Sequence, residues 1–401
     1  MRKIDIVFLI EHKDREMDSV VQIAQFLKKK FAMNSMIVSV DLHIYKLLFI
    51  KPKVVVFPYI IDSNLFPYNF VIKLFGNSVK YLNLNWEQLL SPINLEFKKP
   101  KTNFNRNTLF HIAWDNSFKS FLLENKVRED NIFITGNPTH DILKDLLLSK
   151  NEIKKGLSEQ FNLNMDRIWI FLPMNYGWAF TSDDLIKVKI SRGYDQEIAW
   201  EHQSYSRKCL NQFIYFVKEL ADNFDAEFII RPHPGVSEKS YLKYFENENP
   251  KKENIHIIKD YTIKEWIVSS QIIGSSWSTS VWDAHKIGKT VFLFTPYPRP
   301  KWLDVEWNSM VTNIKDIQGF KKMMNSMTVN ESNKDIVINA IENIGEKIFE
   351  ISQISNPRKK FSFYCLIVSS IHFMRFLLCR YGKCFHVKRI NHSDFFYSIK
   401  V

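Results

Sequence analysis

Arg231, Pro232, His233 and Pro234 form a short cationic segment directly after an apolar run, Ala226–Ile230. Proline fixes its own φ and restricts the preceding residue to extended geometry. The two prolines are therefore expected to hold the His233 imidazole out from the strand in a stiff arch. Arg231 adds a planar fork of donors that suits phosphate or carboxylate. The segment predicts an anion site, and the alternative is a proline-rich turn with a capping histidine.

A second polar segment follows another apolar run, Gln271–Gly274, and precedes a predicted helix. Its hydroxyl residues are Ser275, Ser276, Ser278, Thr279 and Ser280. Hydroxyls and free backbone N–H groups at a helix N-terminus form an anion site. Asp283, one turn into the helix, is placed to reach a sugar hydroxyl, or to interact with the helix dipole instead. Together with His233 on a neighbouring strand, this cluster predicts a nucleotide mono- or diphosphate site, whereas N-capping is the simpler alternative.

Acidic residues follow two predicted strands near the N-terminus. Glu11 and Glu16 come directly after Ile4–Ile10, and Glu87 follows Val79–Leu84. A carboxylate at a cleft between two domains can act as a general base on a hydroxyl. Each acid taken singly also fits a solvated or helix-capping role. No Asp-x-Asp occurs, so no metal holding a diphosphate is predicted.

Apolar runs alternate with helical patterns along most of the chain. Continuous apolar runs of this kind are typical of parallel strands covered on both faces, and their alternation with helices indicates an α/β fold. The predicted strands of the first series are Ile4–Ile10, Met36–Val40, Val54–Phe57, Val79–Leu84, Leu109–Trp114 and Ile132–Thr135. Those of the second are Ile168–Leu172, Ala226–Ile230, Ile255–Ile258, Gln271–Gly274 and Thr290–Phe294. In such sheets ligands bind at the carboxyl ends of the strands, where the polar segments lie.

The length of 401 residues suits two domains. We predict an N-terminal acceptor-side domain over residues 1–150 and a nucleotide-donor domain over 151–330. The polar segment 149–166 marks their boundary, and both are expected to be doubly wound and to face a cleft. A C-terminal helix is predicted over 331–357, and a basic, aromatic tail over 358–401.

The formal net charge of +12 is concentrated in the tail, which holds nine Lys or Arg and one acid. The nearly neutral body argues against a nucleic-acid groove. The apolar part of the tail, 361–379, is interrupted by His372 and Arg375. Its basic flanks favour a helix lying on an anionic membrane surface, with packing on the protein or a membrane span as alternatives.

The cysteines and the N-terminus indicate the compartment. The four cysteines form no CxxC pair, and no Cys/His spacing suits zinc. The N-terminus lacks the features of a signal peptide. These features predict a protein of the reducing cytoplasm. Together with the basic tail, they predict peripheral binding at the inner face of the membrane.

The order of these segments resembles that of GT-B glycosyltransferases, and more closely bacterial capsule and surface-carbohydrate enzymes. These include polysialyltransferases, Kdo transferases, teichoic acid polyol-phosphate polymerases and surface carbohydrate biosynthesis proteins. "IEHKDREMDSVVQIAQFL", which contains Arg15, is similar to the Glu-x-x-x-Arg-Glu opening of the last group. "ITGNPTHDIL", which contains Gly136 and Asn137, is similar to its Thr-Gly-Asn-Pro segment. The resemblance spans roughly residues 4–325.

The resemblance implies roles for particular residues. In polysialyltransferase-like enzymes the His-Pro histidine contacts the donor's cytidine monophosphate and the serine cluster holds its phosphate, which implies His233 and Ser275–Ser280. Their acid-acid-Gly motif carries the base, and Trp86–Gln88 is the matching place. Glu87 is thus the implied base, although tryptophan replaces the first acid and glutamine the glycine. Glu11 and Glu16 stay as rivals, and Arg15, Gly136 and Asn137 are expected to line the cleft.

These features predict a glycosyltransferase that needs neither cofactor nor metal and inverts the transferred centre. Its donor would be a CMP-, CDP- or UDP-linked sugar or polyol phosphate, and its acceptor a glycan or a lipid-linked glycan of a surface polysaccharide. One alternative is a UDP-N-acetylglucosamine-type 2-epimerase, which has the same architecture and a similar Arg-Pro-His-Pro arch. The other is a non-catalytic partner in capsule assembly or export.

Overall fold

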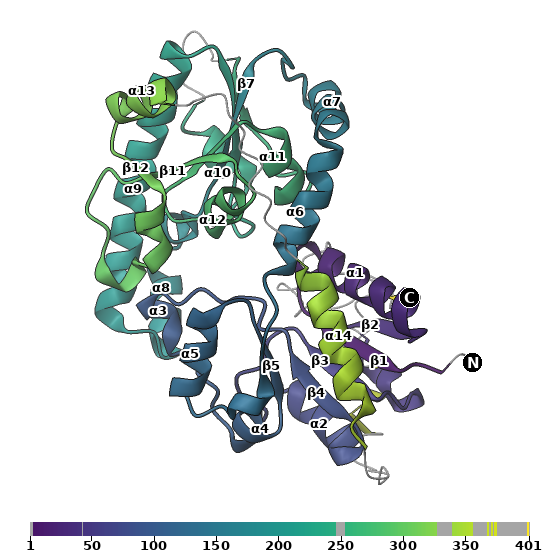
Figure 1. Cartoon of the computed structure of the whole chain (residues 1–401). Coiled ribbons are helices and arrows are strands. Elements are labelled where there is room, and N and C mark those ends of the chain that lie inside the picture. The colour runs from purple at the N-terminus through teal and green to yellow at the C-terminus, as the bar shows by residue number, and fades with distance from the viewer. Residues whose placement is uncertain are drawn as a thin grey trace. The chain divides into compact units, whose positions relative to one another are not determined.

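The computed structural model shows an α/β chain with two sheets of mainly parallel strands (Figure 1). It describes residues 3–41, 43–245, 253–326 and 339–355, and beyond these 367, 368, 370, 371, 373, 374, 399 and 400. Two compact units divide the chain. Unit 1 comprises Met1–Leu90, Asn94–Ile142 and Ile338–Val401, and unit 2 comprises Ser91–Ile93 and Leu143–Val337.

The sheet of unit 1 has the strand order β13-β2-β1-β3-β4-β5-β6. Its parallel strands are β1 (Ile6–Ile10), β2 (Ser35–Ser39), β3 (Val54–Phe57), β4 (Lys80–Asn83), β5 (Phe110–Ala113) and β6 (Ile132–Ile134). The short β13 (Ile399–Lys400) pairs antiparallel with β2. Every residue of β1, β2 and β3 is buried, which is why these strands are continuous apolar runs in the sequence.

Helices cover this sheet, and one of them arrives from far along the chain. The helices of unit 1 are α1 (Lys13–Phe31), η1 (Ile44–Phe49), α2 (Tyr68–Phe75), η2 (Gly76–Ser78), α4 (Asn103–Asn107), α5 (Asn116–Glu124), η3 (Glu129–Asn131) and α14 (Ala340–Gln353). α14 packs beside α1 (Figure 1), where the rings of Phe31 and Phe349 stack with centroids 4.0 Å apart. A Cβ at Gly345 would lie 2.4 Å from the Phe26 ring, so this close contact requires glycine.

Unit 2 contains a fully parallel sheet with the order β12-β11-β10-β7-β8-β9. Its strands are β7 (Ile168–Pro173), β8 (Ala226–Arg231), β9 (Ile255–Ile257), β10 (Ile272–Ser275), β11 (Thr290–Phe294) and β12 (Thr312–Ile314). Alternate side chains of β7 face opposite helices. Ile170 and Leu172 pack with α9, whereas Trp169 and Phe171 pack with α11 and α12. Both sheets are thus parallel cores covered by helices, as the sequence predicts.

The helices of unit 2 lie before, between and after its strands in the sequence. They are α7 (Lys150–Phe161), η4 (Gly177–Phe180), α8 (Asp183–Ser191), α9 (Gln196–Asn223), α10 (Glu238–Leu242), α11 (Ile263–Ser269), α12 (Thr279–Lys286), η5 (Lys301–Leu303), η6 (Glu306–Met310) and α13 (Ile317–Ser326). The elements α3 (Pro92–Leu95) and α6 (Pro138–Leu148) contain residues of both units. Five of these helices begin at a side-chain N-cap, namely Ser182, Asp195, Ser237, Thr262 and Ser278. The polar segment 149–166 is mostly the helix α7.

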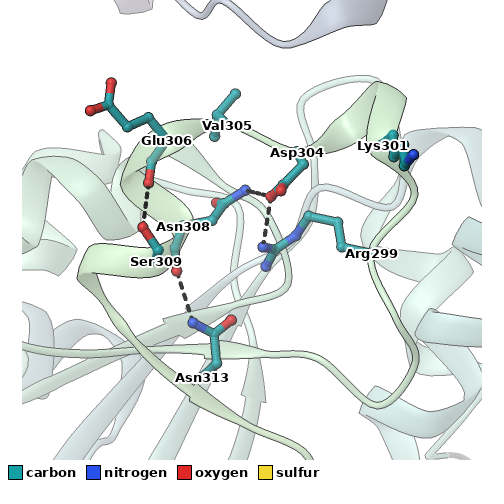
Figure 2. Close-up of a pocket in the computed structure, with 8 residues that line it drawn as sticks. All are labelled: Arg299, Lys301, Asp304, Val305, Glu306, Asn308, Ser309 and Asn313. Carbon is teal, nitrogen blue, oxygen red and sulfur yellow. Dashed lines mark hydrogen bonds and ion pairs between the residues drawn. The ribbon is translucent and has the colours of Figure 1, made fainter.

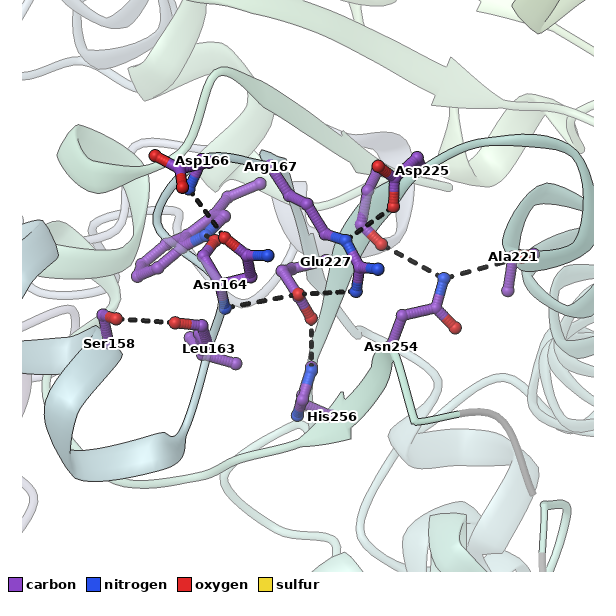
Figure 3. A network of polar contacts seen from close by, with 12 residues as sticks. Ser158, Leu163, Asn164, Asp166, Arg167, Ala221, Asp225, Glu227, Asn254 and His256 are labelled. Atoms are coloured by element: carbon purple, nitrogen blue, oxygen red, sulfur yellow. Dashed lines mark hydrogen bonds and ion pairs between the residues drawn. The ribbon is translucent and has the colours of Figure 1, made fainter.

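A buried carboxylate fixes the amino edge of the unit 2 sheet (Figure 3). Glu227, the second residue of β8, accepts hydrogen bonds from the backbone N–H of Asn164 (3.3 Å) and Arg167 Nη1 (3.1 Å). Its other oxygen lies 2.6 Å from His256 Nε2 on β9. A buried charge requires such partners, and the contacts tie the turn before β7 to β8 and β9.

Most of the predicted tail lies outside the described residues. Within the described part, Val368 packs against the core of unit 1, and the Phe373 ring lies edge-on to Tyr45 with centroids 5.1 Å apart. None of the helices in the described ranges is both long enough and apolar enough to cross a membrane.

Candidate functional site

The segment leaving β7, Met174–Gly177, connects the two polar segments predicted to bind a ligand. β7 lies between β8 and β10, so the arch and the hydroxyl cluster follow strands that share a neighbour and do not pair directly. The N–H of Met174 donates to the Arg231 carbonyl (2.8 Å), and the hydroxyls of Tyr176 and Ser276 lie 2.5 Å apart. The two segments therefore meet at one carboxyl edge, although the prediction that their strands are neighbours is wrong.

His233 is held in one tautomer. Its Nδ1 accepts a hydrogen bond from the N–H of Gly235 (3.1 Å), so the ring proton is on Nε2. Two glycines border the ring, because a Cβ at Gly177 or Gly235 would lie 3.3 or 3.4 Å from Nδ1. His233 is an exposed residue. The surrounding chain nevertheless partly desolvates its ring, and this effect and the nearby Lys259 lower the pKa of His233. The side chain is consequently a neutral imidazole whose Nε2–H can donate a hydrogen bond.

Lysine and arginine brace the arch from the side of β9. Lys259 Nζ donates to the carbonyls of Pro234 (2.8 Å) and Val236 (3.1 Å). The terminal nitrogens of Arg231 donate to the carbonyls of Asp260 and Tyr261, each at 2.7 Å. These bonds clamp the loop after β9 onto β8. The structure thus gives Arg231 backbone partners, and its binding of an anion stays a prediction.

The hydroxyl cluster divides into two parts. Ser275 Oγ donates to the Pro173 carbonyl (2.6 Å), and the Ser276 hydroxyl pairs with Tyr176, so both buried serines join β10 to the β7 exit. Ser278 is the N-cap of α12 and accepts from the N–H of Ser280 (3.3 Å). Thr279 is exposed in the first turn, and Asp283 is half-buried one turn further. The helix N-terminus therefore remains the part of this segment suited to an anion.

Asn175 is a polar residue at this edge that sequence reasoning missed. Its Oδ1 lies 3.4 Å from Ser275 Oγ, and its Nδ2 is buried without a hydrogen-bond partner in the described part of the chain. An unsatisfied buried donor costs about 1–3 kcal/mol. A ligand oxygen would satisfy it. No distinctive spacing marks Asn175 in the sequence, where it lies two residues after Pro173, the last residue of β7.

The three N-terminal acids form one cluster in unit 1, centred on Arg15. Glu16 is fully buried and accepts from the N–H of Glu11 (2.9 Å) and from Arg15 Nη2 (2.7 Å). Arg15 Nη1 donates to Glu87 Oε1. Burial raises the pKa of Glu16, while Arg15 opposes that effect. Glu11 Oε1 accepts from the Tyr68 hydroxyl. The sequence placed these acids after two different strands, and the structure brings them together.

Glu87 is the exposed member of this cluster. Its side chain is 57% exposed, whereas Glu16 is buried and Glu11 is half-buried. Lys98, whose side chain is 6% exposed, donates to the Glu87 carbonyl, and its Nζ lies 3.9 Å from Glu87 Oε2. Arg15 and Lys98 therefore orient a carboxylate that still faces solvent. Nowhere in the described ranges do three His, Cys, Asp or Glu side chains gather in a way that could hold a metal ion.

The residues flanking Glu87 fix its loop to the end of β5. Gln88 Nε2 donates to the Ile112 carbonyl (3.1 Å), and its Oε1 accepts from the N–H of Trp114 (2.8 Å). Asn85 adopts a positive φ of 51° and donates to the same carbonyl (2.9 Å). Trp86 is buried. Gln88, at the place of the expected glycine, thus has a structural role in positioning Glu87.

The Thr-Gly-Asn-Pro segment contacts α14 within unit 1. Gly136 has a φ of +89°, and a Cβ there would lie 3.2 Å from the Ala340 Cβ. Asn137 Oδ1 accepts from the N–H of Thr139 (3.0 Å), and Asn343 Nδ2 donates to the Thr135 carbonyl (3.1 Å). These contacts account for glycine and asparagine structurally, and their role in a cleft stays a prediction.

Lys98 predicts a pH dependence of stability. Burial lowers its pKa to about 8 from an ordinary 10.5, although Glu87 opposes this. Between these values the unfolded chain binds a proton that the folded chain does not, so the free energy of unfolding contributed by Lys98 rises with pH. Urea unfolding at pH 7.5 and 10 should show this rise relative to Lys98→Met. An equal difference in unfolding free energy between the unmodified chain and Lys98→Met at both pH values would contradict this prediction. Lys99→Met, which changes an exposed lysine side chain, is the control.

Comparison with known proteins finds similar structures but no similar sequence family. No family model matches the sequence, and no curated protein matches it. The UDP-GlcNAc 2-epimerase from Neisseria meningitidis bound to UDP-GlcNAc has a TM-score of 0.56 at 16% identity, covering 87% of this chain and 100% of that chain. The Methanocaldococcus jannaschii UDP-GlcNAc 2-epimerase in complex with UDP-GlcNAc and UDP has a TM-score of 0.55 at 14% identity, with the same coverage. The wall teichoic acid polymerase TagF with CDPG has a TM-score of 0.52 at 13% identity, covering 87% and 88%. The chain therefore has the GT-B-like fold that these enzymes share, as predicted.

Proposed function

We propose that this chain is a glycosyltransferase that moves a sugar or polyol phosphate from a nucleotide-activated donor to a growing surface polysaccharide. The observation that carries the proposal is the carboxyl edge of the unit 2 sheet, where His233, Asn175 and the N-terminus of α12 lie on three adjacent strand exits. The matches to TagF with CDPG and to epimerases with UDP-GlcNAc support a nucleotide-linked donor. The basic tail would bind the enzyme to the inner membrane face.

Donor binding is assigned to unit 2. The Nε2–H of His233, the amide of Asn175 and the first N–H groups of α12 would donate to the donor's phosphate oxygens. Negative charge grows on the phosphate as the nucleotide leaves, and fixed donors aimed at that charge stabilise the transition state. These donors belong to the chain itself, so the proposal needs neither a metal ion nor a cofactor.

Proton removal from the acceptor is assigned to Glu87 in unit 1. The acceptor oxygen would attack the transferred carbon, or the phosphorus of a polyol phosphate, as the bond to the nucleotide breaks. Glu87 would take the hydroxyl proton. A single displacement of this kind inverts the attacked centre. Arg15 and Lys98 hold the Glu87 carboxylate for this role, and Glu16 fixes Arg15.

An acceptor-dependence assay tests this function. The chain would be incubated with CMP-N-acetylneuraminic acid, CDP-glycerol or UDP-GlcNAc, each with and without a lipid-linked glycan acceptor in anionic vesicles. We expect one donor to release its nucleotide at least tenfold faster with acceptor, and label to enter the glycan. Release from no donor in the presence of acceptor would sink the proposal.

A 2-epimerase is the second candidate, favoured by the two epimerase structures with TM-scores of 0.56 and 0.55. Such an enzyme would convert UDP-GlcNAc to its 2-epimer with no acceptor present. NMR of UDP-GlcNAc incubated with the chain alone separates the two candidates. Epimer formation would support this second function and contradict the transferase.

A further inference from the structure

The loop between β11 and β12 forms an open pocket of about 570 Å³ within unit 2 (Figure 2). Arg299, Asp304, Asn308 and Asn313 line it together with exposed side chains of the two short helices η5 and η6. Figure 2 shows the Asp304 carboxylate between the Arg299 guanidinium and the Asn308 amide. None of these residues was predicted from the sequence to bind a ligand.

The polar groups of the pocket are arranged to accept hydrogen bonds. Asp304 Oδ1 takes bonds from Asn308 Nδ2 (2.9 Å) and Arg299 Nη1 (3.3 Å), yet the Asp304 side chain is 59% exposed and keeps free lone pairs. The Asn308 amide is oriented by Asp304, and its Oδ1 is buried without a hydrogen-bond partner among the residues described. Sugar and polyol hydroxyls supply the donors that such carboxylate and amide oxygens lack.

Arg299 links the pocket to the predicted phosphate site. Its Nη2 donates to the Ser276 carbonyl (3.5 Å), two residues before the N-cap of α12. Its side chain is only 11% exposed, so the guanidinium is fixed between the hydroxyl cluster and Asp304. A ligand with its phosphate at the α12 N-terminus could therefore extend a hydroxylated group along Arg299 into the pocket.

We propose that this pocket binds the hydroxylated group carried by the donor's phosphate, a sugar or a polyol, through Asp304 and Asn308. The inference rests on the proposed function, because it assumes a nucleotide-linked donor in unit 2. Asp304 and Asn308 would accept from hydroxyls of that group, and Arg299 would keep Asp304 in place. The pocket would thus determine which donor is used, independently of the nucleotide.

Calorimetry with paired ligands tests the inference. Each intact donor is compared with its bare nucleotide: CMP-N-acetylneuraminic acid with CMP, CDP-glycerol with CDP, and UDP-GlcNAc with UDP. We expect the unmodified chain to bind one intact donor more tightly than its nucleotide. Asp304→Ala and Asn308→Ala should each weaken that donor about tenfold and leave the bare nucleotide unchanged, as expected for one lost hydrogen bond. The exposed Glu159→Gln on α7 is the charge-matched control.

Two results would overturn the inference, and they differ in their meaning for the proposed function. Suppose first that the nucleotide binds the unmodified chain. If both variants weaken donor and nucleotide equally, or if neither variant weakens the donor, the pocket does not hold the donor's hydroxylated group. If none of the six ligands binds the unmodified chain, the nucleotide site itself is wrong and both proposals fail. Asp304 is exposed, so its variant remains informative even where Asn308→Ala fails to fold.

Discussion

His233→Ala is expected to lower kcat/KM for donor turnover by about 10²–10³-fold, the cost of removing one fixed donor to developing charge. The neutral imidazole presents Nε2–H at the carboxyl edge of β8, and alanine removes that donor. The arch itself should persist, because Lys259 holds the backbone carbonyls of Pro234 and Val236. Steady-state nucleotide release measures the effect, and thermal unfolding checks that the variant is folded.

His140→Ala on α6 is the matched control for the loss of a histidine, since the proposed function gives this residue no role. Its turnover should equal that of the unmodified chain within about twofold. Unchanged donor affinity and turnover in His233→Ala would rule out the assigned role. A loss of folded protein in that variant would instead mark His233 as structural.

Glu87→Gln is expected to lower turnover by about 10²–10⁴-fold, the range of general acid–base catalysis. Glutamine keeps the size of the side chain but cannot take a proton from an acceptor hydroxyl. Nucleotide binding should be unchanged, because it is assigned to unit 2. The measurement is a rate with saturating donor and acceptor, together with nucleotide affinity by calorimetry.

Variants of the other two acids of the cluster make that test discriminating. Glu11→Gln should keep most activity, since its Oε1 binds the Tyr68 hydroxyl. Glu16→Gln should mainly lower stability, because the buried carboxylate holds both Arg15 and the N–H of Glu11. Full activity in Glu87→Gln with loss in Glu11→Gln would transfer the role of base to Glu11.

The fold could be predicted because parallel strands buried on both faces leave a strong mark in the sequence. Runs such as Val54–Phe57 and Ile168–Pro173 are continuous because each strand packs against helices on two sides. The return of α14 to unit 1 could not be predicted, since it depends on contacts such as Phe31 with Phe349, far apart in the chain. Amphipathic spacing identifies a helix but not its partner.

The candidate site was only partly predictable. Proline geometry and the carboxyl-edge rule place His233 at the carboxyl end of β8, but the exit of β7 lies between it and the β10 exit. The partners of Arg231 were not predictable, because a guanidinium fork suits backbone carbonyls as well as phosphate. Asn175 and Arg299 carry no distinctive spacing, and their interest comes from an unpaired amide and a fixed guanidinium that only coordinates show.

The acids Glu11, Glu16 and Glu87 also show what sequence spacing leaves open. Sequence spacing put three acids at strand ends but could not rank them. Burial and the two bonds from Arg15 separate the buried Glu16 from the exposed Glu87. Lys98, eleven residues after Glu87, completes the arrangement through a loop whose course the sequence does not reveal.

Calorimetric titration of the unmodified chain and of His233→Ala with CMP, CDP, UDP and GDP tests most directly that unit 2 binds a nucleotide at the carboxyl edge of its sheet. We predict that one of the four nucleotides binds the unmodified chain at a single site, and that His233→Ala weakens this binding at least tenfold. Absence of binding by all four, or equal affinity in the variant, would contradict a nucleotide site at the arch.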